Sequence, residues 1–101
     1  MGFVQAAKVQ EVPPGTLREV RVNGKIIALA NVAGKFHAID NVCLHRGGPL
    51  ADGVLEGSVV TCPWHGWQYD ITTGKVGQNP SLGVASYPVE VRGEEIFINV
   101  G

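Results

Sequence analysis

The sequence predicts an all-β fold, with an antiparallel β-sandwich or barrel as its base. Turn signals built on glycine, proline and asparagine recur roughly every ten residues, as they do between short strands. The runs between these turns are rich in β-branched residues, which favour strands. No window of about a dozen residues keeps the period of an amphipathic helix. With 101 residues, the chain has the length of one domain.

Three strands are expected in the N-terminal part of the chain. Segments 16–22 and 35–40 alternate in side-chain character, as half-buried strands do. Segment 25–32 is apolar over nearly its whole length, which predicts a strand that is buried on both faces. The pair Asn23-Gly24 lies between the first two segments and is the strongest hairpin signal in the chain.

Further strands are expected later in the chain. Segments 86–93 and 95–100 alternate valine or isoleucine with other residues and are separated by a glycine-containing turn. Segment 58–61 predicts one brief strand in the middle of the chain. These segments complete the expected β framework.

Strand patterns fail in three segments of the middle third. Segments 41–57, 62–75 and 76–86 are rich in glycine, proline and polar residues and show little alternation. Loops of this length inside a compact domain are usually functional. We therefore expect the functional site on these three loops.

Composition and charge exclude several classes of protein. Eight basic and nine acidic residues give a net charge of −1 without a like-charge block, so no nucleic-acid partner is expected. No apolar run approaches the ~20 residues that a membrane span requires. The N-terminal residues show no cationic stretch followed by an apolar one, so no signal peptide is expected and the predicted location is the cytoplasm.

The chain contains two cysteines, and each has a histidine close by. Cys43 and His45 form a C-x-H pair, and Cys62 and His65 form a C-x-x-H pair. A structural disulfide is not expected in a cytoplasmic chain. Thiolate and imidazole are ligands for iron–sulfur centres, zinc and copper, so these four residues are the candidate metal ligands. The remaining histidine, His37, has no cysteine nearby and is expected to be a surface or packed residue.

The order of the ligands separates two kinds of metal site. A structural zinc would accept two cysteines and two histidines, but zinc-finger spacing separates the cysteine pair from the histidine pair. Here each loop supplies one ligand of each type. This arrangement suits a binuclear site, in which both cysteines bind one iron and both histidines bind the other. The zinc module stays open as a less favoured alternative.

The segments CLHRGGPL (43–50) and CPWHGWQYD (62–70) resemble the Rieske [2Fe–2S] ferredoxin family. The segment GQNPSLGV (77–84) is similar to the proline loop that covers the cluster in that family. The resemblance implies a Rieske fold of three antiparallel sheets in a single domain over residues 1–101. It also implies a cluster-binding subdomain of loops, over about residues 41–84, inserted into a β base.

The resemblance further implies one [2Fe–2S] cluster per chain, held by Cys43, His45, Cys62 and His65. Such a chain is a soluble one-electron carrier and not itself an enzyme. It would pass electrons from an NAD(P)H-dependent flavin reductase to a terminal aromatic-ring oxygenase by transient docking, and it is expected to be a monomer. The alternative is a small Rieske-like subunit of a reductase complex such as nitrite reductase.

Departures from the family pattern refine these expectations. Gly48 and Trp64 stand where respiratory Rieske subunits carry two disulfide cysteines, and Trp67 stands where they carry a serine that bonds a cluster sulfur. Tyr69 matches their tyrosine that bonds a cysteine sulfur. The pattern is therefore closer to the ferredoxins of ring-hydroxylating systems. Without the serine, we expect a potential near the low end of the Rieske range, about −150 mV.

Four further residues of the ligand loops have expected roles. Trp64 is expected to be an exposed contact for a redox partner, and Trp67 to pack. Gly48 and Gly66 are expected to supply backbone conformations that other residues avoid.

Overall fold

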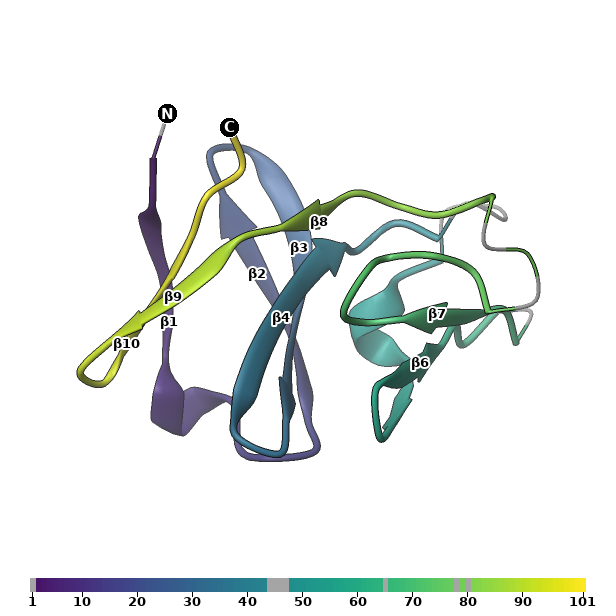
Figure 1. Ribbon diagram of the computed structural model, residues 1–101, viewed down its shortest axis with the longest axis horizontal. Helices are drawn as coiled ribbons and strands as arrows, with labels where there is room; N and C mark the ends of the chain where they lie inside the picture. The colour runs from purple at the N-terminus through teal and green to yellow at the C-terminus, as the bar shows by residue number, and fades with distance from the viewer. Residues whose placement is uncertain (1, 44–47, 65, 78, 80) are drawn as a thin grey trace.

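A computed structural model of the protein describes residues 2–43, 48–64, 66–77, 79 and 81–101. Its regular structure consists of strands and two short 3₁₀ helices, so the predicted all-β class is confirmed (Figure 1). The strands are β1 (Val4–Lys8), β2 (Leu17–Val22), β3 (Lys25–Val32), β4 (Lys35–Asp40), β5 (Val54–Glu56), β6 (Val59–Thr61), β7 (Gln68–Asp70), β8 (Ser86–Tyr87), β9 (Val89–Arg92) and β10 (Glu95–Ile98), and the 3₁₀ helices are η1 (Val9–Glu11) and η2 (Leu50–Asp52).

The strands form three antiparallel sheets, as the resemblance implied. Their orders are β1-β10-β9, β2-β3-β4-β8 and β5-β6-β7. The first two sheets make up the base of the molecule, where both termini lie (Figure 1). The third sheet lies at the opposite end and comes between β4 and β8 in the sequence. No helix in the described residues is long and apolar enough to cross a membrane.

The β2–β3 hairpin forms where the sequence predicted it. Asn23 and Gly24 both have positive φ angles, 50° and 82°, which a two-residue turn of type I′ requires. Ala33 (φ 52°) and Gly34 (φ 94°) repeat this conformation between β3 and β4. The buried Asn31 supports this second turn, because the Gly34 N–H donates to its Oδ1 at 2.8 Å.

The predicted burial of β3 on both faces is confirmed, because β3 separates two hydrophobic cores. On one face, Ile27 and Leu29 pack in the core of the base. On the other face, Ala28 and Ala30 belong to the core that continues into the third sheet. Full burial of one aliphatic side chain stabilises a fold by roughly 1.5–3 kcal/mol. Both cores therefore depend on this one strand.

The predicted strand over 86–93 is wrong in one respect, since the structure divides it in two. β8 pairs with β4, whereas β9 pairs with β10 in another sheet. Pro88 stands between them, and proline has no N–H to donate to a sheet ladder. The chain therefore leaves one sheet and enters the next at this proline.

Three strands were not predicted from the sequence. β1 lacks a run of β-branched residues, and a bulge between Gln5 and Ala7 interrupts its pairing with β10. β5 and β7 have three residues each and lie inside segments that were expected to be loops. Such short strands depend on their neighbours in the sheet, so local sequence signals them weakly. The predicted brief strand at 58–61 is confirmed as β6.

Candidate metal centre

Three loops gather at the end of the molecule that is remote from both termini (Figure 1). The first follows β4 and carries Cys43, and the second joins β6 to β7 and carries Cys62. The third is the segment 76–84, which precedes β8. These are the three segments in which the functional site was expected.

The two cysteine loops are closed in the same way. The Cys43 N–H donates to the carbonyl oxygen of Gly48 at 2.9 Å, and the Cys62 N–H donates to that of Trp67 at 2.7 Å. In each loop the bond joins the cysteine to the residue five positions later. Gly66, at φ +74°, helps the second loop to turn, and its N–H donates to the Cys62 carbonyl oxygen at 3.1 Å. Its expected special backbone conformation is confirmed.

Neither cysteine forms a disulfide, and both side chains lie in one core cluster, each with 2% of its surface exposed. Gly48 brings the two loops into contact. A Cβ atom at this position would lie 2.9 Å from Cys62 Sγ and 3.1 Å from Cγ of Trp64. The position requires glycine because it has no room for a side chain.

Tyr69 provides a polar contact to the first thiol. Its hydroxyl oxygen lies 3.1 Å from Cys43 Sγ, and its side chain is fully buried. The residue lies on β7, where it pairs with Val60 of β6. The contact that the resemblance implied for Tyr69 is therefore confirmed. When the sulfur is a thiolate, the tyrosine O–H is the donor, and this bond lowers the cost of burying the negative charge.

Asn41 holds the first loop to the base. Its Oδ1 accepts the Ala51 N–H at 2.7 Å, and its carbonyl oxygen accepts the Leu50 N–H at 2.7 Å. Its own N–H donates to Ile26 of β3 at 3.1 Å, and its Nδ2 donates to Glu19 of β2 at 3.3 Å. Asn41 is 4% exposed and lies two residues before Cys43. Sequence reasoning missed this role, since a single asparagine after a strand is a weak signal.

The third loop is anchored to the strands beside it. The Val76 N–H donates to the Leu82 carbonyl oxygen at 2.9 Å, and the Val84 N–H donates to that of Gly74 at 2.8 Å. Within the loop, the Asn79 side chain accepts both the N–H and the hydroxyl of Ser81, at 3.2 and 2.6 Å. The described residues of this loop are thus bonded to one another and to Gly74, which lies shortly after β7.

The structure brings two of the four predicted ligands together. Cys43 and Cys62 share one core, on neighbouring loops that touch at Gly48. The predicted ligands His45 and His65 lie outside the described residues. Two buried thiols with a hydroxyl directed at one of them suit an iron or zinc site that is bound through cysteine. The donor set that the structure describes therefore fits a cysteine-held metal centre.

The family model for the Rieske [2Fe–2S] domain matches residues 2–88 of the chain. The chain belongs to the Rieske [2Fe–2S] domain family. The expected cofactor class, one [2Fe–2S] cluster, is thereby confirmed, and the zinc alternative is overturned. A Rieske cluster uses two histidines in place of two cysteines, which agrees with a chain that has only two cysteines.

Relatives of known role are similar over nearly the whole chain. The ferredoxin component of the naphthalene 1,2-dioxygenase/salicylate 5-hydroxylase systems of Ralstonia sp. is 35% identical over 99 residues, which cover 97% of this chain and 95% of the relative. The solved ferredoxin of carbazole 1,9a-dioxygenase from Nocardioides aromaticivorans IC177 is 29% identical, with a TM-score of 0.89 and 97% of each chain covered. The expected Rieske fold is therefore confirmed.

A third similar structure contains a partner. It is a complex of reduced oxygenase and oxidized ferredoxin in carbazole 1,9a-dioxygenase, with 30% identity and a TM-score of 0.85. The match covers 95% of this chain and 91% of that one.

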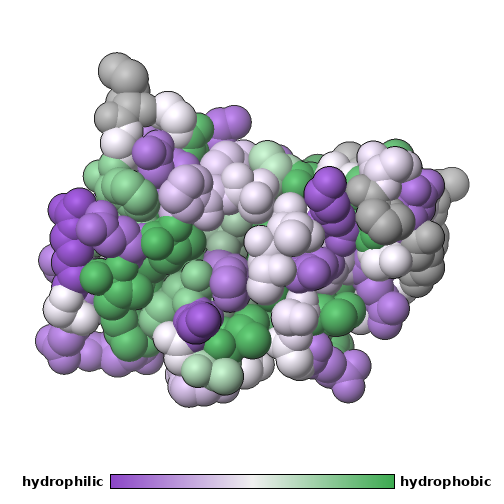
Figure 2. All heavy atoms as spheres, viewed as in Figure 1, coloured by the Kyte–Doolittle hydropathy of each residue, from purple (hydrophilic) through white to green (hydrophobic). Residues whose placement is uncertain are grey.

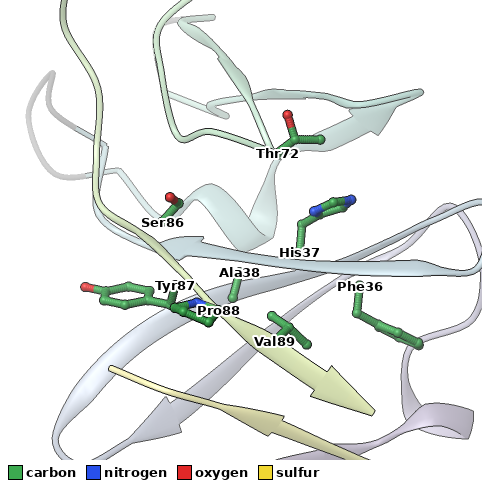
Figure 3. Close-up of a pocket in the computed structure, with 8 residues that line it drawn as sticks. All are labelled: Phe36, His37, Ala38, Thr72, Ser86, Tyr87, Pro88 and Val89. Atoms are coloured by element: carbon green, nitrogen blue, oxygen red, sulfur yellow. The ribbon is translucent and has the colours of Figure 1, made fainter. Parts of the chain in front are cut away.

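His37 lies apart from the cysteines, on β4 of the base. It points into an open pocket of about 420 Å³ beneath the turn that follows β7, with Thr72 across from it (Figure 3). The residues that line this pocket include no cysteine; they are Phe36, His37, Ala38, Thr72, Ser86, Tyr87, Pro88 and Val89. This placement agrees with the expectation that His37 is not a ligand of the Rieske site.

The two tryptophans of the second Rieske loop differ in their surroundings. Trp67 packs against the core that contains the cysteines, as predicted. Trp64 has 55% of its surface exposed, although part of its indole ring lies against Gly48. It is therefore held in place on one side and open to a partner on the other.

Proposed function

We propose that this protein is the ferredoxin component of an aromatic-ring dioxygenase system. It carries one electron at a time and performs no substrate chemistry of its own. The main support for this proposal is that this chain and the Ralstonia ferredoxin component match over nearly the full length of both. A nitrite reductase subunit, the alternative from the sequence, has no comparable support.

The proposed ligands are the two cysteines for one iron, Cys43 and Cys62, and two histidines for the other, His45 and His65. When bound, the cluster supplies a reversible one-electron couple. We further propose that the chain is a single domain over 1–101, in which residues 41–84 act as the cluster-binding subdomain. Two observations support this boundary: the segment contains a sheet of its own, and it is tied to the base at Asn41.

The described residues prepare the site for negative charge. Burial of Cys43 and Cys62 excludes water from their sulfurs. The Tyr69 hydroxyl then replaces one of the hydrogen bonds that water would have made to Cys43. The anchored loops fix the positions of both sulfurs, which reduces reorganisation when the charge changes.

The partners in this proposal are a flavin-containing, NAD(P)H-dependent reductase and a terminal oxygenase. The protein meets each of them by transient docking, as a monomer in the cytoplasm. A solved complex of a related ferredoxin with its oxygenase supports the oxygenase half of this scheme. Weak redox encounters usually bury less than about 1,200 Å² in total, which suits a small group of loops.

Electron paramagnetic resonance of the dithionite-reduced protein tests the cluster and its ligands. We expect the low average g value that mixed histidine and cysteine ligation produces. The variant His65→Ala should lose this signal and iron, whereas the matched control His37→Ala should keep both, because His37 lies in the separate pocket of the base (Figure 3). If His65→Ala keeps its colour, iron content and spectrum, the proposed ligand set is wrong.

A further inference from the structure

Exposed apolar side chains are concentrated on the part of the molecule that carries the loops. Of the seven large hydrophobic residues exposed in the described part of the chain, five lie within residues 41–84. Three of these lie on the three loops, one on each: Val42 (52% exposed), Trp64 (55%) and Leu82 (42%). We call these three residues the loop-end apolar residues. Exposed apolar groups that gather around a site mark an interaction surface.

The same loops are almost free of charge. The whole chain has 17 charged side chains, eight basic and nine acidic. In the sequence segments 41–49, 62–68 and 76–84, the one lysine, arginine, aspartate or glutamate is Arg46. Hydrophilic residues are visible at both ends of the molecule, and at the far end of the base they lie around the β9–β10 hairpin (Figures 1 and 2). That hairpin includes the exposed ion pair between Arg92 and Glu90.

From these observations we propose that the loop end binds an uncharged, apolar face of the terminal oxygenase, with Trp64 as the anchor. This inference rests on the proposed function, which supplies the partner, and it adds the chemistry of the contact. We infer an apolar partner face because each of the three loops exposes one large apolar side chain, Val42, Trp64 or Leu82. A charged face would lose its hydration there, and the sequence of these loops offers only Arg46 as a charged partner.

Trp64 is the anchor because it combines a large exposed area with a fixed position. Its ring lies against Gly48, so the side chain loses little freedom when a partner covers its open side. Tryptophans that a partner buries in this way are common hot spots of interfaces. Val42 and Leu82 are exposed on the other two loops, and in this proposal they help to exclude water from the contact.

The physical consequence is an association rate that hardly responds to salt. Charge-steered redox pairs associate more slowly as ionic strength rises, because salt screens their attraction. An apolar contact has no such long-range attraction to lose. From about 0.01 M to 1 M salt, the Debye length falls from about 30 to about 3 Å, which is a wide enough range to tell the two cases apart.

Stopped-flow mixing of the reduced, cluster-loaded protein with terminal oxygenases provides the test. The oxygenases of the naphthalene, biphenyl and carbazole systems are compared, and the one reduced fastest is used. We expect the second-order rate constant to change less than about two-fold over the salt range. Trp64→Ala should lower it about 30-fold, and Leu82→Ser about five-fold, with an unchanged paramagnetic spectrum and midpoint potential.

Val91→Ala is the matched control, because Val91 is 45% exposed on β9 of the base, and its rate should equal that of the unmodified protein. If Trp64→Ala does not retain the cluster, the rate constant of Leu82→Ser tests the apolar contact instead. A rate constant that falls steeply with salt would overturn the proposed apolar contact, and so would variants that transfer electrons at the full rate. Neither result would contradict the proposed function as an electron carrier. A normal Rieske spectrum without transfer to any of the oxygenases would overturn the proposed function as well.

Discussion

At the scale of single residues, Tyr69 joins the hydrophobic core to the metal site. Its ring is fully buried among apolar side chains, while its hydroxyl reaches Cys43 Sγ. A buried tyrosine needs a partner for its hydroxyl, and here the partner is a proposed ligand atom. The residue therefore stabilises the fold and adjusts the charge on the sulfur together.

Tyr69→Phe should lower the midpoint potential of the cluster by about 60 mV. The bond from the hydroxyl stabilises the more negative, reduced state, and a loss of about 1.4 kcal/mol corresponds to about 59 mV for one electron. A redox titration followed by visible absorption measures the change. Tyr87→Phe is the matched control, since Tyr87 bonds to Asp40 instead, and its potential should not move. Equal potentials in all three proteins would contradict this role for Tyr69.

Gly48 shows a residue-scale feature that the sequence left ambiguous. A glycine in a loop is most simply explained by its backbone freedom. Only the three-dimensional contact with Cys62 and Trp64 shows that the reason is space. The motif itself identified the cysteines, because the spacing of ligands is a local property of the chain. Contacts between separate loops are not local, so sequence patterns do not report them.

At the scale of elements, the connections between the base and the loops depend on Asp40 and Asn41 at the end of β4. Asn41 bonds to β2, to β3 and to the first loop. The Asp40 N–H donates to the Ala85 carbonyl oxygen at 2.9 Å, and its carboxylate accepts the Tyr87 hydroxyl at 2.6 Å. The first loop therefore leaves the base at the same place where the third loop returns to it.

Asn41→Ala should reduce both the stability of the fold and the retention of the cluster. The change leaves the partly buried Ala51 N–H without its acceptor, at a cost of about 1 kcal/mol. Urea unfolding measures the first effect, and the rate of iron loss to a chelator measures the second. Asn31→Ala is the control, because Asn31 is equally buried but bonds to Val12 and Gly34 within the base. It should lower stability without faster iron loss; if both variants lose iron alike, Asn41 has no special role.

The Tyr87–Asp40 bond predicts a pH dependence of stability. Burial, the hydrogen bond to Asp40 and the charge of Asp40 together raise the pKa of Tyr87 to about 12. Because the folded state holds this proton more tightly than the unfolded state, its contribution is complete below pH 10 and is lost as pH rises toward 12. The stability difference between the unmodified protein and Tyr87→Phe should therefore shrink across that window. Urea unfolding of both proteins at several alkaline pH values measures it, and a constant or growing difference would contradict the assignment.

Sequence patterns predicted the long elements of this fold well and the short ones poorly. Three strands, β2, β3 and β4, are long enough for a side-chain pattern to appear in the sequence. The Asn23-Gly24 turn joins the first two. β5 and β7 have only three residues each and exist because β6 pairs with both. Pro88 itself is visible in the sequence. The sequence does not show that the chain changes sheets there, because this depends on which strands pair in three dimensions.

At the scale of the whole molecule, the two cores meet at β3 and should unfold together. Ile27 and Leu29 belong to one core, and Ala28 and Ala30 to the other. Neither core can lose β3 alone, which favours a single cooperative transition. The molecule measures 36 × 27 × 19 Å, a size at which two-state unfolding is usual.

Thermal unfolding followed by two probes tests this coupling. Both tryptophans of the chain lie in the second loop, so their fluorescence reports the loop end, whereas far-ultraviolet circular dichroism reports all the strands. We expect coincident transitions, and a higher midpoint for the loaded protein than for protein treated with a chelator, because a bound cofactor stabilises the folded state. Fluorescence that changes well before the dichroism would show that the loop end unfolds on its own.

The matching closure of the two cysteine loops has a consequence for protein engineering. Each loop is sealed by a main-chain bond that starts at the cysteine itself and ends five residues later. Both bonds join main-chain atoms, which are common to all amino acids, so neither bond uses a side-chain atom. With Gly48 and Gly66 kept, the two loops can therefore serve as a pair of exchangeable cassettes, into which other metal-binding side chains are introduced to create artificial redox centres.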